Sequence, residues 1–216
     1  MLNAGTDLLR NFWYLALPGA ALKPGGTATR TLLGEALLIG RDAKGGVFAL
    51  RDVCPHRGIP LRHGSFDGTE ITCCYHGWRF ATDGRCTAIP SLVDGQALHL
   101  ERIRAGSFPC REVQGNVWVF MAGDGRAANA ALPPVPALPG FDDAVPKISI
   151  ASPFPCHTDH AAFGLMDPTH AAFIHTSWWW KGKADRLKLK EKRFEPSPLG
   201  WRMTRHPVPS ANRAYR

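Results

Sequence analysis

The sequence predicts an all-β domain in its N-terminal half, followed by a shorter segment of mixed α and β structure. Between Phe12 and Phe120, short apolar stretches alternate with turn residues such as Asp67-Gly68 and Asp83-Gly84. Short strands at such spacing are typical of a β-sandwich or barrel. No stretch of about 12 residues between them shows the apolar periodicity of a helix. The clearest strands are Leu37-Leu38-Ile39, Val47-Phe48-Ala49-Leu50 and Val117-Trp118-Val119-Phe120.

The composition then changes, which indicates a domain boundary. We expect a β domain over residues 12–121, a linker rich in proline, alanine and glycine over residues 122–146, and a partial α+β domain over residues 147–216. In the last part, the best helix candidate runs from Asp159 to His175, although Pro168 interrupts it. Because proline is tolerated best in a first turn, a new helical turn is expected to start near Asp167, with Asp167 as its N-cap.

Charge and hydropathy exclude several classes of protein. No apolar run approaches the roughly 18–20 residues that cross a bilayer, and the first ten residues lack the features of a secretory signal. We therefore expect a cytoplasmic protein that does not bind membranes. The residues after Trp180 include 11 basic and 3 acidic side chains, so the whole net charge of +8 lies there. Because no nucleic-acid-binding motif accompanies this charge, we expect a solvated surface and no nucleic-acid partner.

Two pairs of cysteine and histidine form the strongest motif. Cys54-Pro55-His56 has the pattern Cys-x-His, and Cys73-Cys74-Tyr75-His76 has the pattern Cys-x-x-His. In a Rieske [2Fe–2S] centre two cysteines bind one iron and two histidines bind the other, and the imidazoles raise the reduction potential. Each loop would give one ligand to each iron, so a cluster would join the two loops.

The main alternative is a single structural zinc ion with two cysteine and two histidine ligands. Zinc fingers usually place the two cysteines together and the two histidines together, whereas each loop here mixes the two types.

Glycines beside the motifs are expected to let backbone amides approach the sulfur atoms; they are Gly58, Gly64 and Gly77. The remaining isolated cysteines are expected to be buried, small apolar side chains: Cys86, Cys110 and Cys156.

Residues Phe12 to Met121 resemble the Rieske domain of the ring-hydroxylating, non-haem iron oxygenases. Cys74 stands where that family usually has a proline, but only Cys73 has the two-residue spacing to His76. Ile59 and Tyr75 occupy the positions of the extra disulfide cysteines of respiratory Rieske proteins, which favours the oxygenase type or a Rieske ferredoxin. The resemblance implies that the [2Fe–2S] cluster is held by Cys54, His56, Cys73 and His76.

A second motif combines Asp167 with His170 and His175. Two imidazoles and a carboxylate with open positions form the facial triad of non-haem Fe(II) oxygenases. On a regular helix, however, histidines five residues apart are separated by about 140°, so the helix must end or bulge for both to face one metal. By themselves, ordinary core or surface histidines would explain this pair better.

The stretch from Gly164 to His175, followed by Trp178-Trp179-Trp180, is similar to the iron-binding segment Asp-x-x-His-x4-His of the same family. The resemblance implies that His170 and His175 bind a mononuclear Fe(II). It implies that Asp167 takes part in catalysis by hydrogen-bonding an iron-ligand histidine and linking it to the Rieske histidine of a neighbouring subunit. Gly164 departs from the asparagine that many members carry there.

The third iron ligand should be a carboxylate from farther along the chain. Only Asp185, Glu191 and Glu195 follow His175, and pairing with nearby lysines explains the two glutamates better. We therefore expect the chain to end inside its catalytic domain. The alternatives of a fragment, a frameshifted product and a genuine short protein stay open.

The resemblance implies the terminal oxygenase component of a Rieske oxygenase, or a truncated version of it. A ferredoxin or a flavin reductase fed by NAD(P)H would supply electrons, and O2 would be used to hydroxylate or demethylate an aromatic or similar apolar small molecule. Electron transfer between subunits implies a homotrimer. The alternative is a Rieske electron-transfer module, or an inactive truncated oxygenase, without a mononuclear iron.

Overall fold

The structure is a computed structural model, and it describes residues 9–93, 95–96, 98–123, 131–137, 140, 150–167, 174, 193–197 and 200–205. The chain divides into two compact units, Met1–Ile150 and Ala151–Arg216. No helix within these described ranges is both long enough and apolar enough to span a membrane.

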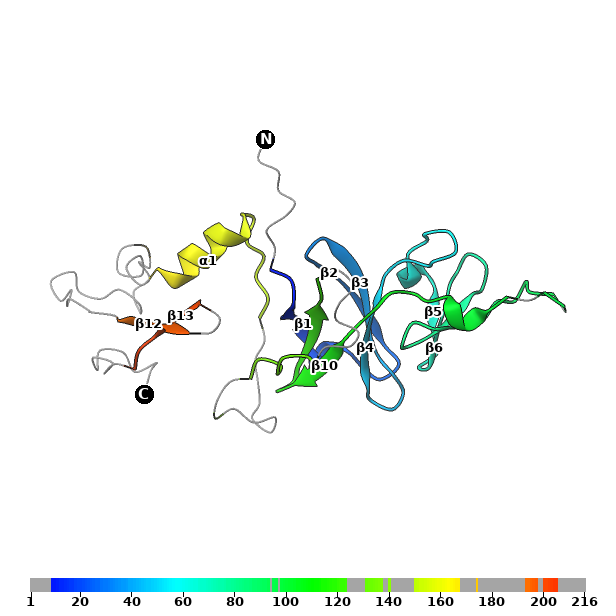
Figure 1. The fold of residues 1–216 in the computed structure, drawn as a ribbon, viewed down its shortest axis with the longest axis horizontal. Helices are drawn as coiled ribbons and strands as arrows, with labels where there is room; N and C mark the ends of the chain where they lie inside the picture. Colours follow the sequence, from blue (N-terminus) through cyan, green and yellow to red (C-terminus); the bar gives the residue numbers. More distant parts are fainter. Residues whose placement is uncertain are drawn as a thin grey trace. The chain divides into compact units, whose positions relative to one another are not determined.

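The described residues of the first unit form three antiparallel sheets, as the turn-bounded apolar stretches predicted (Figure 1). One sheet has the order β1-β11-β10, with β1 (Phe12–Pro18), β10 (Cys110–Val113) and β11 (Asn116–Met121). The second has the order β2-β3-β4-β9, with β2 (Thr27–Leu32), β3 (Glu35–Arg41), β4 (Val47–Arg51) and β9 (Ser107–Phe108). The third has the order β5-β6-β7-β8, with β5 (Ser65–Phe66), β6 (Glu70–Thr72), β7 (Arg79–Ala81) and β8 (Cys86–Ala88). Three short 3-10 helices connect them: η1 (Gly19–Ala21), η2 (Leu61–His63) and η3 (Leu100–Arg102).

The central sheet is buried on both faces. Successive side chains of a strand point to opposite faces, and in β3 Leu37 and Ile39 join one core while Leu38 joins another. The first core is shared with β1 and β11, through residues such as Val117. The second is shared with the small sheet β5–β8, through residues such as Phe80. Strand β3 is therefore an almost continuous apolar run.

The two cysteine–histidine loops leave different sheets, the first from the central sheet and the second from the small sheet. The first lies between β4 and η2, and the second lies between β6 and β7. The segment after the first loop lies against the segment before the second. Ser65 pairs with Thr72, and a Cβ added to Gly64 would lie 2.0 Å from the carbonyl oxygen of Thr72. Because Thr72 precedes Cys73 directly, this glycine controls how near the first loop segment comes to the second.

Part of the predicted linker lies along the β domain. The indole Nε1 of Trp13 donates a hydrogen bond to the carbonyl oxygen of Pro133 at 2.8 Å. The ring of Trp13 also packs edge-on against Phe120, with centroids 5.3 Å apart. Residues 131–137 contain no helix or strand, and residues 124–130 and 141–149 lie outside the described part, so the linker boundaries stay a prediction.

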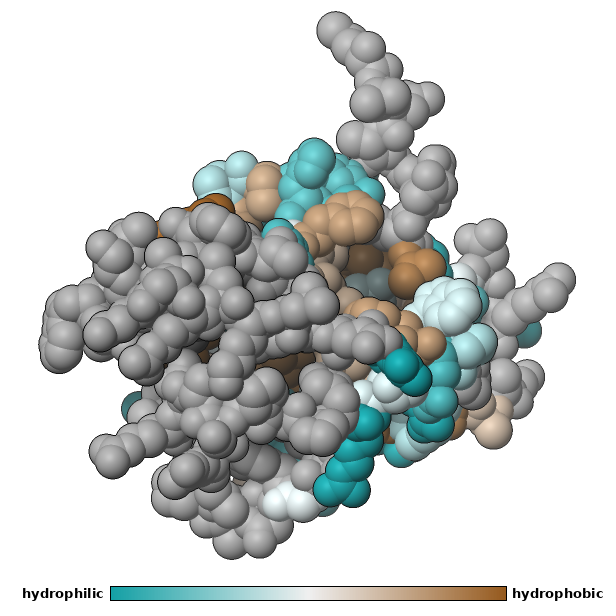
Figure 2. Space-filling model, turned by 90° about the vertical axis from the view of Figure 1, so that its left-hand side faces the viewer, coloured by the Kyte–Doolittle hydropathy of each residue, from teal (hydrophilic) through white to brown (hydrophobic). Residues whose placement is uncertain are grey.

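The second unit contains helix α1 (Thr158–Met166) and a hairpin of β12 (Phe194–Ser197) and β13 (Gly200–Met203). The predicted helix is present but ends at Met166. Asp167 is extended, with φ −72° and ψ 111°, because a following proline disfavours the helical conformation. No residue of α1 is buried, and Phe163 and Leu165 are about three-quarters exposed. Apolar and hydrophilic side chains lie interspersed on the face that Figure 2 shows.

The contact at Gly64 gives a test of this packing. We expect Gly64→Ala to lower the free energy of unfolding by about 1–3 kcal/mol, because the added methyl group overpacks the contact with Thr72. Urea unfolding monitored by tryptophan fluorescence measures the change. Gly106→Ala is the control, since its Cβ would lie an ordinary 3.5 Å from the Cβ of Arg51. Equal losses in the two variants would contradict the packing assigned to Gly64.

Candidate metal centre

The first candidate loop is a tight turn that begins at Cys54. The N–H of Cys54 donates to the carbonyl of Ile59 at 2.8 Å, and the N–H of Gly58 donates to the carbonyl of Cys54 at 2.9 Å. Gly58 has φ +75°, a backbone conformation that residues other than glycine rarely adopt. This closure places His56 in the middle of the turn.

The second loop repeats the same closure from Cys73. The N–H of Cys73 donates to the carbonyl of Trp78 at 2.8 Å, and the N–H of Gly77 donates to the carbonyl of Cys73 at 3.0 Å. Gly77 has φ +68°. The two loops therefore share one backbone design, although the histidine comes two residues after the cysteine in the first and three in the second.

The two thiols meet inside the core. Cys54 and Cys73 are only 2% and 3% exposed, and they belong to the apolar cluster that the small sheet shares with the central sheet. Burial, with a smaller contribution from the hydrogen bond to Cys73, raises the pKa of the Cys54 thiol to about 11, while the N–H groups of His56 and Arg57 act in the opposite direction. The backbone therefore approaches a sulfur atom in the first loop, while the part expected of Gly58, Gly64 and Gly77 in such contacts stays a prediction.

The two imidazoles lie together on the outer side of the loops. The ring centroids of His56 and His76 are 4.6 Å apart, in an edge-on arrangement. Trp78 stacks on His56 with centroids 4.4 Å apart and an interplanar angle of 2°, and Tyr75 packs against His76. Desolvation, and then the charges of His76 and Arg57, lower the pKa of His56. The shift favours the neutral form of His56, which is the form that binds metals.

The four candidate ligands form two pairs of donors and do not surround a single point. Among the residues that the structure describes, no three His, Cys, Asp or Glu side chains gather so that they could hold a single metal ion. The thiols form one pair and the imidazoles form another. A [2Fe–2S] cluster with two protein ligands on each iron fits this donor set, whereas a single zinc ion would require all four donors around one point.

The second predicted motif is described only at its first residue. Asp167 caps the end of α1, and its N–H donates to the carbonyl of Phe163 at 2.9 Å. His170 and His175 lie outside the described residues, as do Trp178-Trp179-Trp180, Asp185 and Glu191. Glu195 is described, and it accepts a hydrogen bond from Arg202 at 2.5 Å across the β12–β13 hairpin. Its partner is thus an arginine, where the sequence had suggested lysines.

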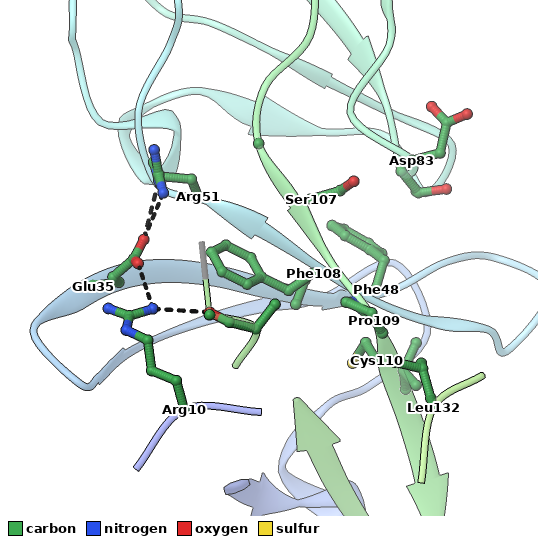
Figure 3. Close-up of a pocket in the computed structure, with 16 residues that line it drawn as sticks. Arg10, Glu35, Phe48, Arg51, Asp83, Ser107, Phe108, Pro109, Cys110 and Leu132 are labelled. Carbon is green, nitrogen blue, oxygen red and sulfur yellow. Dashed lines mark hydrogen bonds and ion pairs between the residues drawn. The ribbon is translucent and has the colours of Figure 1, made fainter. Parts of the chain in front are cut away.

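An open pocket of about 960 Å³ lies elsewhere in the first unit (Figure 3). Figure 3 shows Glu35 between Arg10 and Arg51, and its carboxylate accepts hydrogen bonds from them at 3.3 and 2.8 Å. Phe48, Phe108 and Leu132 supply apolar walls. None of the predicted site residues lines this pocket, so we assign it no part in the metal chemistry.

Comparisons with known proteins agree with this geometry. Residues 12–109 match the family model described as a Rieske [2Fe-2S] domain. The 4beta-methylsterol monooxygenase of Methylococcus capsulatus (strain Bath) is 35% identical over 199 residues, which cover 88% of this chain and 53% of that protein. The oxygenase subunit of 3-chlorobenzoate-3,4-dioxygenase from Comamonas testosteroni is 36% identical over 132 residues, which cover 61% of this chain and 29% of that protein.

Solved structures give the same picture. The oxygenase of carbazole 1,9a-dioxygenase, in complex with its ferredoxin, superposes with a TM-score of 0.52 and 28% identity, over 62% of this chain and 34% of that chain. The chain therefore contains a Rieske [2Fe–2S] domain. The relatives that it matches are oxygenases or oxygenase subunits, in line with the resemblance. The chain spans about half the length of the methylsterol monooxygenase and less of the other two.

The buried thiols predict a selective pattern of alkylation in the metal-free chain. The thiolate is the reactive form, so a pKa of about 11 for Cys54 and about 12 for Cys110 keeps both protonated at pH 8. We expect iodoacetamide at pH 8 to label the exposed Cys74 and Cys156 first, as measured by peptide mass spectrometry. Labelling of Cys54 should accelerate as the pH rises toward 11. The exposure of Cys156 also corrects the expectation that it is buried.

The ligand assignment predicts different outcomes for two adjacent cysteines. Cys73→Ser should abolish cluster assembly because the buried thiol opposite Cys54 is lost, whereas Cys74→Ser should leave the visible spectrum and iron content unchanged because Cys74 is exposed. Iron, sulfide and absorbance are measured after reconstitution of each variant. Loss of the cluster in Cys74→Ser, with retention in Cys73→Ser, would show that Cys74 is the ligand and would contradict the assignment to Cys73.

Proposed function

We propose that this chain acts as the terminal oxygenase component of a Rieske non-haem iron oxygenase. In this role it would take electrons from a ferredoxin or from a flavin reductase fed by NAD(P)H. It would use them for O2-dependent hydroxylation or demethylation of an aromatic or similar apolar molecule. The observation that supports the proposal most strongly is the pairing of two buried thiols with two outward imidazoles on equivalent loops of a Rieske domain.

Four residues would hold the cluster in this proposal, namely Cys54, His56, Cys73 and His76. When bound, a Rieske cluster supplies one-electron transfer at a raised potential. Cys54 and Cys73 would lose their protons on binding, because thiolate is the metal-binding form. Trp78 would hold the ring plane of His56 through their parallel stacking. The exposed His76 would leave one side of the site open to an electron-transfer partner.

His170 and His175 would hold a mononuclear Fe(II) in the second part of the protein, and Asp167 would orient one of these histidines. The support is the spacing Asp-x-x-His-x4-His together with the names of the relatives, which include a monooxygenase and a dioxygenase. The boundaries at residues 121 and 146, a homotrimer and a cytoplasmic location belong to the same proposal. The partner is supported by the similar carbazole oxygenase, whose structure contains a ferredoxin.

A second candidate function is electron transfer without oxygenation. Glu195, one of three carboxylates after His175, is already paired with Arg202 in a hairpin. The facial triad requires a carboxylate ligand, and this pairing gives Glu195 a partner other than a metal ion. A chain whose second part holds no iron would be a Rieske electron-transfer module or an inactive oxygenase.

Metal analysis separates these functions. The full chain is purified without air, and iron, zinc and acid-labile sulfide are measured before and after addition of Fe(II) and removal of the excess. We expect two irons and two sulfides from the cluster, and a third iron after Fe(II) addition that is lost in His170→Ala and His175→Ala. His160→Ala is the control, because His160 is an exposed histidine of α1. A constant two irons would favour the electron-transfer module, and one zinc without sulfide would contradict the Rieske assignment.

A further inference from the structure

Asp52 is the one charged residue that is fully buried in the part of the chain that the structure describes. It follows strand β4 directly and precedes Cys54 by two residues. Its side chain is 0% exposed. A buried carboxylate is unfavourable unless it is both hydrogen-bonded and paired with a cation. The contacts of Asp52 therefore show what this charge accomplishes in the domain.

Arg62 supplies both kinds of partner. Its backbone N–H donates to Oδ1 of Asp52 at 2.8 Å, and its guanidinium Nη1 donates to Oδ2 at 2.7 Å. The N–H of Asp52 in turn donates to the carbonyl of Ala36 in β3 at 2.9 Å. The carboxylate thus joins helix η2, which contains Arg62, to the central sheet. We refer to Asp52 and Arg62 as the clamp.

The clamp closes the base of the first loop. The residues between its two members are 53–61, which include both candidate ligands of that loop, Cys54 and His56. Inside this span, the hydrogen bond from Cys54 to Ile59 closes the turn itself. The loop is therefore held twice, once by its own backbone and once by the clamp outside it.

The clamp also reaches the second loop through the backbone. Two residues after Arg62, Gly64 lies against the carbonyl of Thr72, and the next residue, Ser65, pairs with Thr72. Thr72 is followed directly by Cys73. A displacement of Arg62 would thus change the position of the first loop relative to the second.

We propose that the clamp positions the cluster ligands: the buried carboxylate of Asp52 holds Arg62 so that Cys54 stays opposite Cys73, and His56 opposite His76. Neither member of the clamp is a ligand, so both are positioning residues that act through the backbone they hold. The inference rests on the proposed function, because it takes these four residues as the ligands.

The test compares Asp52→Asn, Arg62→Gln and Arg62→Lys in the full chain with its cluster. Asp52→Asn keeps the size of the side chain but removes its charge. Partners that orient metal ligands typically contribute about 10- to 100-fold to metal affinity. We expect Asp52→Asn and Arg62→Gln to release the cluster to a chelator about 10-fold faster, with changed EPR g-values and a shifted reduction potential. Arg62→Lys retains the charge and should lie closer to the wild type.

Asp83→Asn and Arg85→Gln are matched controls. Asp83 and Arg85 form an ion pair at 2.7 Å, but both side chains are about half exposed and no candidate ligand lies between them. Both controls should keep the wild-type release rate and EPR spectrum. If Asp52→Asn does not fold, Arg62→Gln decides the question, since the backbone hydrogen bond to Asp52 survives in it.

Two outcomes overturn the inference, and they are distinguishable. If the wild type holds its cluster and both Asp52→Asn and Arg62→Gln match it in release rate and EPR spectrum, the clamp has no positioning role and the proposed function stands. If the wild type assembles no [2Fe–2S] cluster under reducing, iron- and sulfide-rich conditions, the proposed function and the inference both fail.

Discussion

The meeting of two thiols from separate loops inside one apolar core is the constraint on which the first unit depends. Cys54 and Cys73 can approach each other only because the small sheet packs on one face of the central sheet, through side chains such as Ile71 and Phe80. The opposite face of the central sheet is covered by β1 and β11. The position of the loops is therefore set by the packing of three sheets, and the loops themselves add only local closure.

The same loops separate their two kinds of donor between the core and the surface. Both thiols are buried, and the pKa of about 11 keeps the Cys54 thiol protonated until a metal displaces the proton. The imidazoles lie outward, and His56 is fixed by stacking on Trp78 from the other loop. Around a bound cluster, buried sulfur would protect the iron from solvent, and outward imidazole would shorten the distance to an external electron donor or acceptor. One backbone design, used twice, would thus serve both stability and electron exchange.

In the second unit, the local sequence determines where the helix stops. Asp167 leaves the helical conformation because the following proline disfavours it, so α1 ends before either candidate iron-binding histidine. A nine-residue helix with no buried side chain is marginal by itself. The chemistry proposed for this unit consequently depends on sequence spacing and on the relatives, whereas that of the first unit depends on packed geometry.

The sequence by itself determined the strands and the four candidate cluster ligands. Short apolar stretches bounded by turn residues, such as Leu37-Leu38-Ile39, indicate strands from neighbouring residues alone, and the Cys-x-His and Cys-x-x-His spacings lie within single turns. Only the tertiary structure decided the stacking of Trp78 on His56, the buried pair of Asp52 and Arg62, and the exposure of Cys156. The physical reason is that such contacts depend on strand register and sheet packing, which bring residues together across the chain. Local sequence patterns carry no information about which distant segments will meet.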